Sequence, residues 1–94
     1  MRVRWLRTTL KNLIAEAEYI AQDNPTAAAE FISSVITAVT GLTRYPALGR
    51  PGRVSGTREL VVSHTPYIVP YRVRLSVIEV LRVFHSSRKW PTQF

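Results

Sequence analysis

The spacing of apolar residues switches from a helical to a strand period in the middle of this chain, and that switch restricts the fold more than any other feature. Two stripes with a period near 3.6 occupy the first half. They consist of Leu10, Leu13, Ile14, Ala17, Ile20 and Ala21, and of Ala28, Phe31, Ile32, Val35, Val39 and Leu42. Asn24 and Pro25 lie between the stripes and suit the N-cap and the first position of a helix. We therefore expect one helix that follows a cap at Thr8 or Thr9, and a second from Pro25 to about Leu42, joined as a helical hairpin.

The second half carries strand patterns. Residues 45–56 contain two prolines and three glycines and predict a loop. Four short runs have the alternation or apolar content of strands: residues 2–5, 57–63, 66–74 and 76–84. Pro70 lies inside the third run, which indicates a sheet edge or a bulge there. The last run is apolar on both faces, as is typical of an interior strand.

These elements predict the order β-α-α-β-β-β in one domain, residues 1–94. The two helices must bury their apolar stripes against one face of a sheet. We expect an α+β fold with an antiparallel sheet of about four strands and a helical hairpin packed on one face.

Several classes of protein are excluded by what the sequence lacks. The chain has no cysteine, which excludes disulfides, thiolate metal sites and a cysteine nucleophile. It has no apolar run approaching the roughly 18 residues of a membrane span, and Met1–Leu10 does not resemble a signal peptide. His64 and His85 are too isolated to form a recognisable metal site. We expect a cytoplasmic protein with no metal, no cofactor and no membrane partner.

The positive charge is confined to the second half of the chain. Residues 1–43 carry four basic and four acidic side chains, whereas residues 44–94 carry nine basic side chains against two glutamates, the whole excess of +7. Eleven of the thirteen basic residues are arginine, which suits forked contacts to phosphate or carboxylate. The pattern indicates a polyanionic partner, either nucleic acid or an acidic protein segment. The candidate target-binding residues are Arg58, Arg72, Arg74, Arg82, Arg88 and Trp90.

The chain resembles the ParE/RelE toxin superfamily, and most closely its ParE branch. The resemblance rests on several segments taken together in order and spacing. They are Tyr19-Ile20-Ala21 before Asp23-Asn24-Pro25, Tyr45-Pro46 before Gly49-Arg50, Gly56 to Val61, Tyr67-Ile68 with Tyr71-Arg72-Val73, and Val80 to Val83 leading to His85, Arg88 and Trp90-Pro91.

The resemblance implies the toxin of a type II toxin–antitoxin system, a kind of module associated with plasmid stabilisation. It implies a cognate antitoxin that inactivates the toxin and contacts operator DNA itself, so that the toxin meets the operator only indirectly. An acidic, amphipathic antitoxin segment would suit the helical hairpin and the basic sheet face. Members similar to ParE poison DNA gyrase and block replication, whereas members similar to RelE cleave mRNA on the ribosome. The shared fold does not choose between them.

A ribonuclease needs a base, a phosphate clamp and an acid, which Glu59, Arg72 and His85 could supply. The alternative is that Glu59 forms an ion pair and His85 is structural. No tyrosine follows His85, and Lys89 is the only lysine near it, a departure from the RelE-like pattern. The sequence therefore favours a ParE-like inhibitor without chemistry of its own over a RelE-like endonuclease, and whether the protein is an enzyme stays open. A plain nucleic-acid-binding module is the third hypothesis, and no groove-reading motif supports it.

Overall fold

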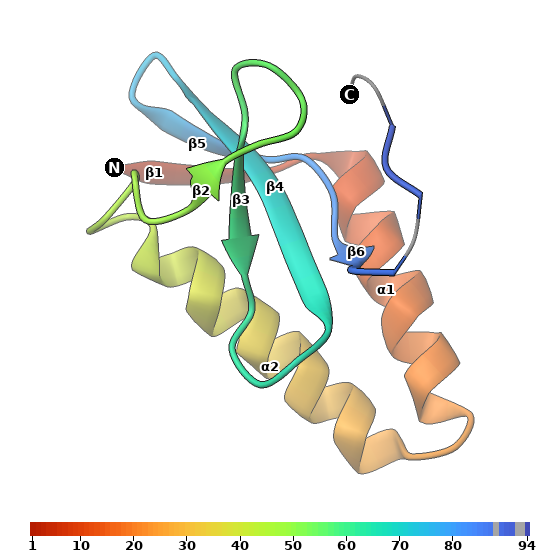
Figure 1. Ribbon diagram of the computed structural model, residues 1–94. Helices are drawn as coiled ribbons and strands as arrows, with labels where there is room; N and C mark the ends of the chain where they lie inside the picture. The colour runs from red at the N-terminus through yellow and green to blue at the C-terminus, as the bar shows by residue number, and fades with distance from the viewer. Residues whose placement is uncertain (88, 92–93) are drawn as a thin grey trace.

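In the computed structural model, two helices pack on one face of a six-stranded sheet (Figure 1). The structure describes residues 1–87, 89–91 and 94. The elements are β1 (Arg2–Trp5), α1 (Arg7–Ala21), α2 (Pro25–Gly41), β2 (Arg50–Pro51), β3 (Arg58–Val61), β4 (Tyr67–Arg74), β5 (Val77–Val80) and β6 (Phe84–His85). The predicted α+β fold with a helical hairpin on one sheet face is confirmed.

The sheet differs from the predicted four antiparallel strands. Its strand order is β1-β5-β4-β3-β2, and β6 also pairs with β4. The sheet is mixed because β1 runs parallel to β5, with Arg2 opposite Val77, while the other pairs are antiparallel. A parallel neighbour requires a long connection, and here the helical hairpin and three strands separate the two. The additional strands, β2 and β6, have two residues each, too few for a periodic pattern in the sequence.

Helix α2 follows the sequence prediction. The Asn24 side chain accepts a hydrogen bond from the Ala27 N–H at 3.0 Å, and Pro25 is the first helical residue. This cap satisfies one of the free N–H groups at the helix start. The predicted stripe faces the core: Phe31, Val35 and Val39 are buried.

Helix α1 follows the predicted stripe in part: Leu13 and Ala17 are buried in the core, but other members of the stripe are not. It begins at Arg7, and Leu10 and Ile14 are 43% and 55% exposed, whereas Thr9 and Glu16 are buried. The Thr9 hydroxyl donates to the Val80 carbonyl at 2.7 Å, so it bonds to the sheet instead of capping the helix. Thr9 and Glu16 occupy positions on the side of α1 that faces the sheet, because each has a hydrogen-bond partner inside the fold. Leu10 and Ile14 lie on the side that faces solvent.

The core lies between the helices and one face of the sheet, which we call the inner face. The core residues of that face include Leu60, Tyr67, Val69, Tyr71, Ile78 and Val80. The Tyr71 hydroxyl donates to the Pro46 carbonyl at 2.7 Å and accepts from the Gly49 N–H at 2.9 Å. This side chain therefore fastens the loop after α2 to the centre of the sheet.

Pro70 interrupts the sheet from within. It lies opposite Glu59 of β3 on one side, so it is not at an edge. On the other side the Leu81 N–H donates to the Pro70 carbonyl at 2.9 Å, and proline has no N–H to return. The Leu81 carbonyl accepts instead from the Arg82 guanidinium at 2.7 Å. The predicted strand 76–84 is therefore divided into β5 and β6.

The interruption adds one residue and changes which face the chain presents. Val80 lies opposite Tyr71 and Phe84 opposite Ile68, so three residues of one strand span two residues of β4. Such an insertion has the effect of a β-bulge. When the register of a strand shifts by one residue, every side chain after the shift lies on the opposite face of the sheet. His85 therefore lies opposite Tyr67, on the inner face.

Within the part of the chain that the structure describes, no helix is long and apolar enough to cross a membrane.

Candidate functional site

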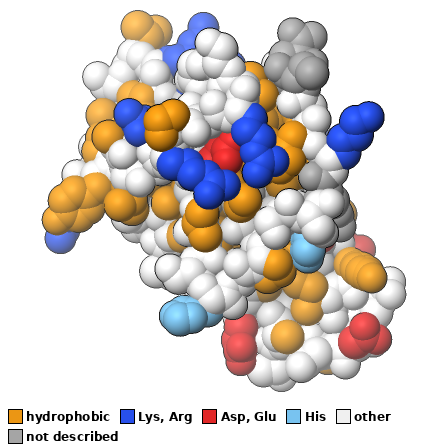
Figure 2. Space-filling model, in the orientation of Figure 1, with side chains coloured by type: hydrophobic (Ala, Val, Ile, Leu, Met, Phe, Trp, Pro, Cys, Tyr) orange, Lys and Arg blue, Asp and Glu red, His pale blue; other side chains and the backbone are white. Residues whose placement is uncertain are grey.

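Basic side chains gather on the sheet face that points away from the helices, which we call the outer face. The strand register aligns Arg4, Glu79 and Arg72 across β1, β5 and β4. It likewise aligns Arg50 with Glu59 across β2 and β3. Figure 2 shows Lys and Arg side chains, with an acidic side chain between them, over the half of the molecule that holds the strands and their loops, and further acidic side chains towards the end where α1 and α2 are joined. Most of the positive charge therefore gathers over the strands, where Glu59 and Glu79 lie among the arginines.

Glu59 is the buried centre of one arginine cluster. Its side chain is 2% exposed. The Arg50 Nη2 lies 3.1 Å from Oε1, and the Arg53 backbone N–H donates to Oε2 at 2.8 Å. The Arg53 guanidinium also stacks 4.2 Å from the centre of the Trp90 ring. The carboxylate therefore accepts hydrogen bonds from the loop that contains β2 and fixes that loop on the sheet.

Glu79 is the centre of a second cluster. The Arg72 Nε donates to Oε1 at 2.7 Å, and Arg4 and Arg74 lie 3.7 and 3.9 Å from the carboxylate. The hydrogen bond from Arg72 is the largest cause that lowers the pKa of Glu79 below its usual value. The charges of all three arginines add to this effect, and burial opposes it. Three cations around one carboxylate leave positive charge on this part of the outer face.

The predicted target-binding residues have different environments. Arg72 and Arg74 lie on the outer face, and Arg74 is the more exposed. Arg58 lies opposite Tyr71 and donates to the Gly49 carbonyl at 2.7 Å, so it holds a loop. Trp90 packs on Phe84 with ring centres 4.9 Å apart, and its buried indole N–H has no hydrogen-bond partner among the described residues.

Arg82 and Arg88 are the remaining predicted target-binding residues. The Arg82 guanidinium holds the Leu81 carbonyl and lies 5.7 Å from the centre of the Phe94 ring. Arg88 lies outside the described residues.

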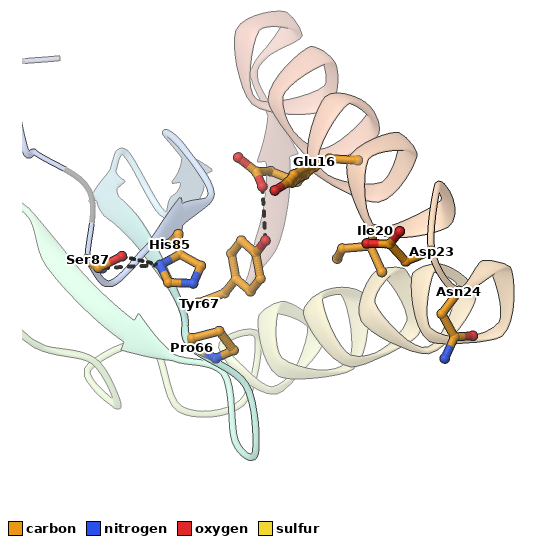
Figure 3. A pocket seen from close by; sticks show the side chains of 9 residues that line it. Glu16, Ile20, Asp23, Asn24, Pro66, Tyr67, His85 and Ser87 are labelled. Atoms are coloured by element: carbon orange, nitrogen blue, oxygen red, sulfur yellow. Dashed lines mark hydrogen bonds between the residues drawn. The ribbon is translucent and has the colours of Figure 1, made fainter.

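His85 lines a pocket on the opposite side of the sheet. The pocket has a volume of about 630 Å³ between the end of α1, the link to α2, the start of β4 and β6. Its lining residues are Glu16, Tyr19, Ile20, Asp23, Asn24, Pro66, Tyr67, His85 and Ser87 (Figure 3).

Hydrogen bonds order the polar groups of this pocket. The Tyr67 hydroxyl donates to Glu16 Oε2 at 2.9 Å, and the Tyr67 ring meets the His85 ring edge-on at 5.4 Å between centres. The Ser87 N–H donates to His85 Nδ1 at 3.2 Å, so in the neutral ring Nε2 carries the proton. The buried Glu16 was not among the predicted site residues. Its spacing from Leu13 and Ile20, by three and four positions, is the signal that could have indicated an inward side chain.

The structure does not bring the three candidate ribonuclease residues together. Glu59 and Arg72 are on the outer face, each in its own ion-pair cluster, whereas His85 is on the inner face. Among the described residues, no group of three or more His, Cys, Asp or Glu side chains could hold a metal ion.

Comparisons with known proteins agree with this architecture. Residues 3–90 match the model of the family described as the ParE toxin of type II toxin–antitoxin system, parDE. The chain is 47% identical to the Y4kP protein of Sinorhizobium fredii over 90 residues, covering 96% of this chain and 93% of that protein. It is 34% identical to the toxin RelE2 of Caulobacter vibrioides over 87 residues, covering 93% and 97%.

Solved structures are also similar over almost the whole chain. The chromosomal ParDE system of P. aeruginosa contains a chain with a TM-score of 0.80 and 27% identity, with 90% of this chain and 95% of that chain covered. Because the family model and the relatives match nearly the full length, this chain belongs to the ParE toxin family of type II toxin–antitoxin systems.

Proposed function

We propose that this protein is a growth-inhibiting toxin that poisons DNA gyrase in the cytoplasm by binding it, without chemistry of its own, and that a cognate antitoxin neutralises it. The observation that supports a binding mechanism is the separation of Glu59 and Arg72 from His85 by the sheet. An acid and a base that act on one phosphate must both lie within hydrogen-bond reach of it. Side chains on opposite faces of a sheet do not meet that condition.

The engagement of Glu59 adds support. Both of its oxygens are occupied by Arg50 and Arg53, and the side chain is 2% exposed. A substrate hydroxyl would have to displace these donors before the carboxylate could accept its proton. We therefore assign Glu59 the role of an anchor for the β2 loop, and assign target contact to the more exposed Arg72 and Arg74.

The antitoxin surface that we propose combines the helical hairpin with part of the basic outer face. Leu10 and Ile14 lie one turn apart on α1 and are exposed, and Ile36 of α2 is 47% exposed. An amphipathic segment could cover these apolar residues while its acidic side chains meet the arginines. The similar chain in the ParDE system of P. aeruginosa supports this partner class. Contact with operator DNA would then come through the antitoxin.

One alternative has specific support. The relative in C. vibrioides is named RelE2, and a structure of the toxin–antitoxin complex RelBE2 from Mycobacterium tuberculosis is similar, with a TM-score of 0.59, 26% identity, and coverage of 89% and 95%. A RelE-like endonuclease would need to use groups on one face, such as His85 with Glu16 in the inner pocket.

Induced expression in a bacterial host distinguishes the two mechanisms. Pulse labelling should show that DNA synthesis stops before protein synthesis and that cells filament, and a His85→Gln variant should remain toxic. Purified protein should inhibit supercoiling by gyrase. If protein synthesis stops first, transcripts carry new cut ends and the His85→Gln variant is harmless, the endonuclease mechanism holds instead.

A further inference from the structure

The hairpin between β4 and β5 extends past β3 and ends in an exposed leucine. Residues 75 and 76 form its two-residue turn, since Arg74 lies opposite Val77. β3 begins with Arg58 opposite Tyr71, so the last three residues of β4 extend past it. The Leu75 side chain is 98% exposed. Figure 1 shows this hairpin at the ends of β4 and β5, on the side where the loop between β2 and β3 also lies.

Local structure does not account for a leucine at this position. The φ angles of Leu75 and Ser76 are 51° and 63°, as in a type I′ turn. Such turns favour asparagine, aspartate and glycine, because a positive φ is sterically unfavourable for a bulky side chain. With nearly all of its side chain in solvent, Leu75 gains little from packing in return. A residue that violates local preference without compensation inside the fold is expected at a functional position.

The surroundings of the tip are cationic. Arg74 directly precedes Leu75. Arg74 and Arg2 lie on either side of Val77 in the strand register, since both are paired with it. Arg4 and Arg72 follow on the same face, with Glu79 the one acidic side chain among these four arginines in the strand register. Val73, 42% exposed, lies two positions before Leu75 and on the inner face, opposite to these arginines. The tip thus presents an apolar side chain with arginines on one side.

We propose that Leu75 is an anchor that inserts into an apolar pocket with an acidic rim on the protein that this toxin poisons. A single apolar side chain that fills a pocket at the centre of a small interface often contributes a large share of the binding energy. The arginines would meet the acidic rim, which speeds association and fixes the orientation. The inference rests on the proposed function, since it requires a protein target.

A protein fits this tip better than a nucleic acid. A leucine that wedges between base pairs works together with basic side chains that hold the flanking phosphates. Here Arg4, Arg72 and Arg74 all approach the carboxylate of Glu79, within 2.7 to 3.9 Å. Their positive charge is partly neutralised before any partner arrives.

Two substitutions in the turn separate a functional leucine from a structural one. Leu75→Asn removes the apolar side chain and supplies a residue that the turn favours, whereas Ser76→Gly relieves the same backbone conformation and keeps Leu75. We expect both variants to melt at temperatures equal to or a few degrees above the wild type. We expect Leu75→Asn to reduce growth inhibition at least tenfold at equal protein level, and Ser76→Gly and Leu75→Met to remain toxic.

Each other result has a defined meaning. If the wild type arrests growth and a folded Leu75→Asn variant arrests it equally, this inference is overturned while the proposed function stands. If the wild type does not arrest growth, the proposed function fails and the inference fails with it. Loss of duplex DNA binding in a gel shift, in step with loss of toxicity, would assign the tip to nucleic acid. A Leu75→Asn variant that stays toxic but escapes the antitoxin encoded beside it would assign the tip to the antitoxin.

Discussion

The hydroxyl of Tyr67 meets the buried carboxylate of Glu16 between helix and sheet, at 2.9 Å. Removing the hydroxyl in Tyr67→Phe takes a donor from the carboxylate of Glu16, a residue that is 4% exposed. We expect a loss of about 1–3 kcal/mol in the free energy of unfolding, measured by urea denaturation. Tyr19→Phe is the matched control, because Tyr19 is 62% exposed and should change stability by less than about 0.5 kcal/mol. Equal effects of the two substitutions would contradict a special role for this bond.

The ion pairs of Glu79 make the free energy of unfolding depend on pH, with a sign that the direction of the pKa shift fixes. Its pKa in the folded protein is lowered, chiefly by the hydrogen bond from Arg72. The ionised carboxylate therefore stabilises the fold fully above its unfolded pKa, and this contribution is lost as the pH falls through that value towards the lower folded one. We expect Glu79→Gln to be less stable than the wild type at pH 7 and the difference to shrink below about pH 4. Chemical denaturation at pH 7 and pH 3 measures this, and a difference that grows in acid would reverse the sign.

At the scale of the elements, α2 depends on its cap. The Asn24 side chain accepts from the Ala27 N–H, and we expect Asn24→Ala to lower the free energy of unfolding by about 1 kcal/mol. Asn24→Ser keeps an acceptor at the N-cap and should retain most of the stability. Thermal melts of both variants check this, and an unchanged melting temperature in Asn24→Ala would show that tertiary packing alone fixes the helix start.

The elements also divide into those that local sequence predicts and those it does not. The start of α2 was predictable because its cap and its apolar stripe are encoded within the helix itself. The inward face of α1 was predicted only in part: Leu13 and Ala17 are buried as expected, but the burial of Thr9 depends on a hydrogen bond from its hydroxyl to the Val80 carbonyl, 71 positions away. The sheet face on which His85 lies could not be predicted for a similar reason. Pro70 indicated an interruption, but the one-residue insertion depends on how the next strand pairs.

The candidate site likewise divides into what local sequence predicts and what depends on distant residues. The sequence showed that positive charge is concentrated in the second half of the chain, but the grouping of Glu59 with Arg50 and Arg53 depends on a loop that Tyr71 and Arg58 hold in place. Loop conformation of this kind arises from contacts between distant residues, which no local pattern encodes.

For the whole molecule, the position of charge matters more than its sum. We expect Arg74→Glu to reduce toxicity at least tenfold while the protein stays folded, because Arg74 is exposed on the outer face beside the hairpin tip. Arg7→Glu changes the net charge by the same amount on α1 and should stay toxic. Growth arrest at matched protein level, with circular dichroism of both variants, compares them. If both lose toxicity equally, a general charge effect replaces a specific surface.

The parallel pairing of β1 with β5 has a consequence for the point in synthesis at which the fold can be completed. The pairing joins residues 2–5 to residues 77–80, so the edge of the sheet is completed only when nearly all of this domain has been synthesised. A ribosome that stops before β5 releases a chain in which β1 has no neighbour and β4 lacks one side of its ladder. On the proposed function, a nonsense or frameshift mutation anywhere before residues 77–80 is therefore expected to abolish toxicity.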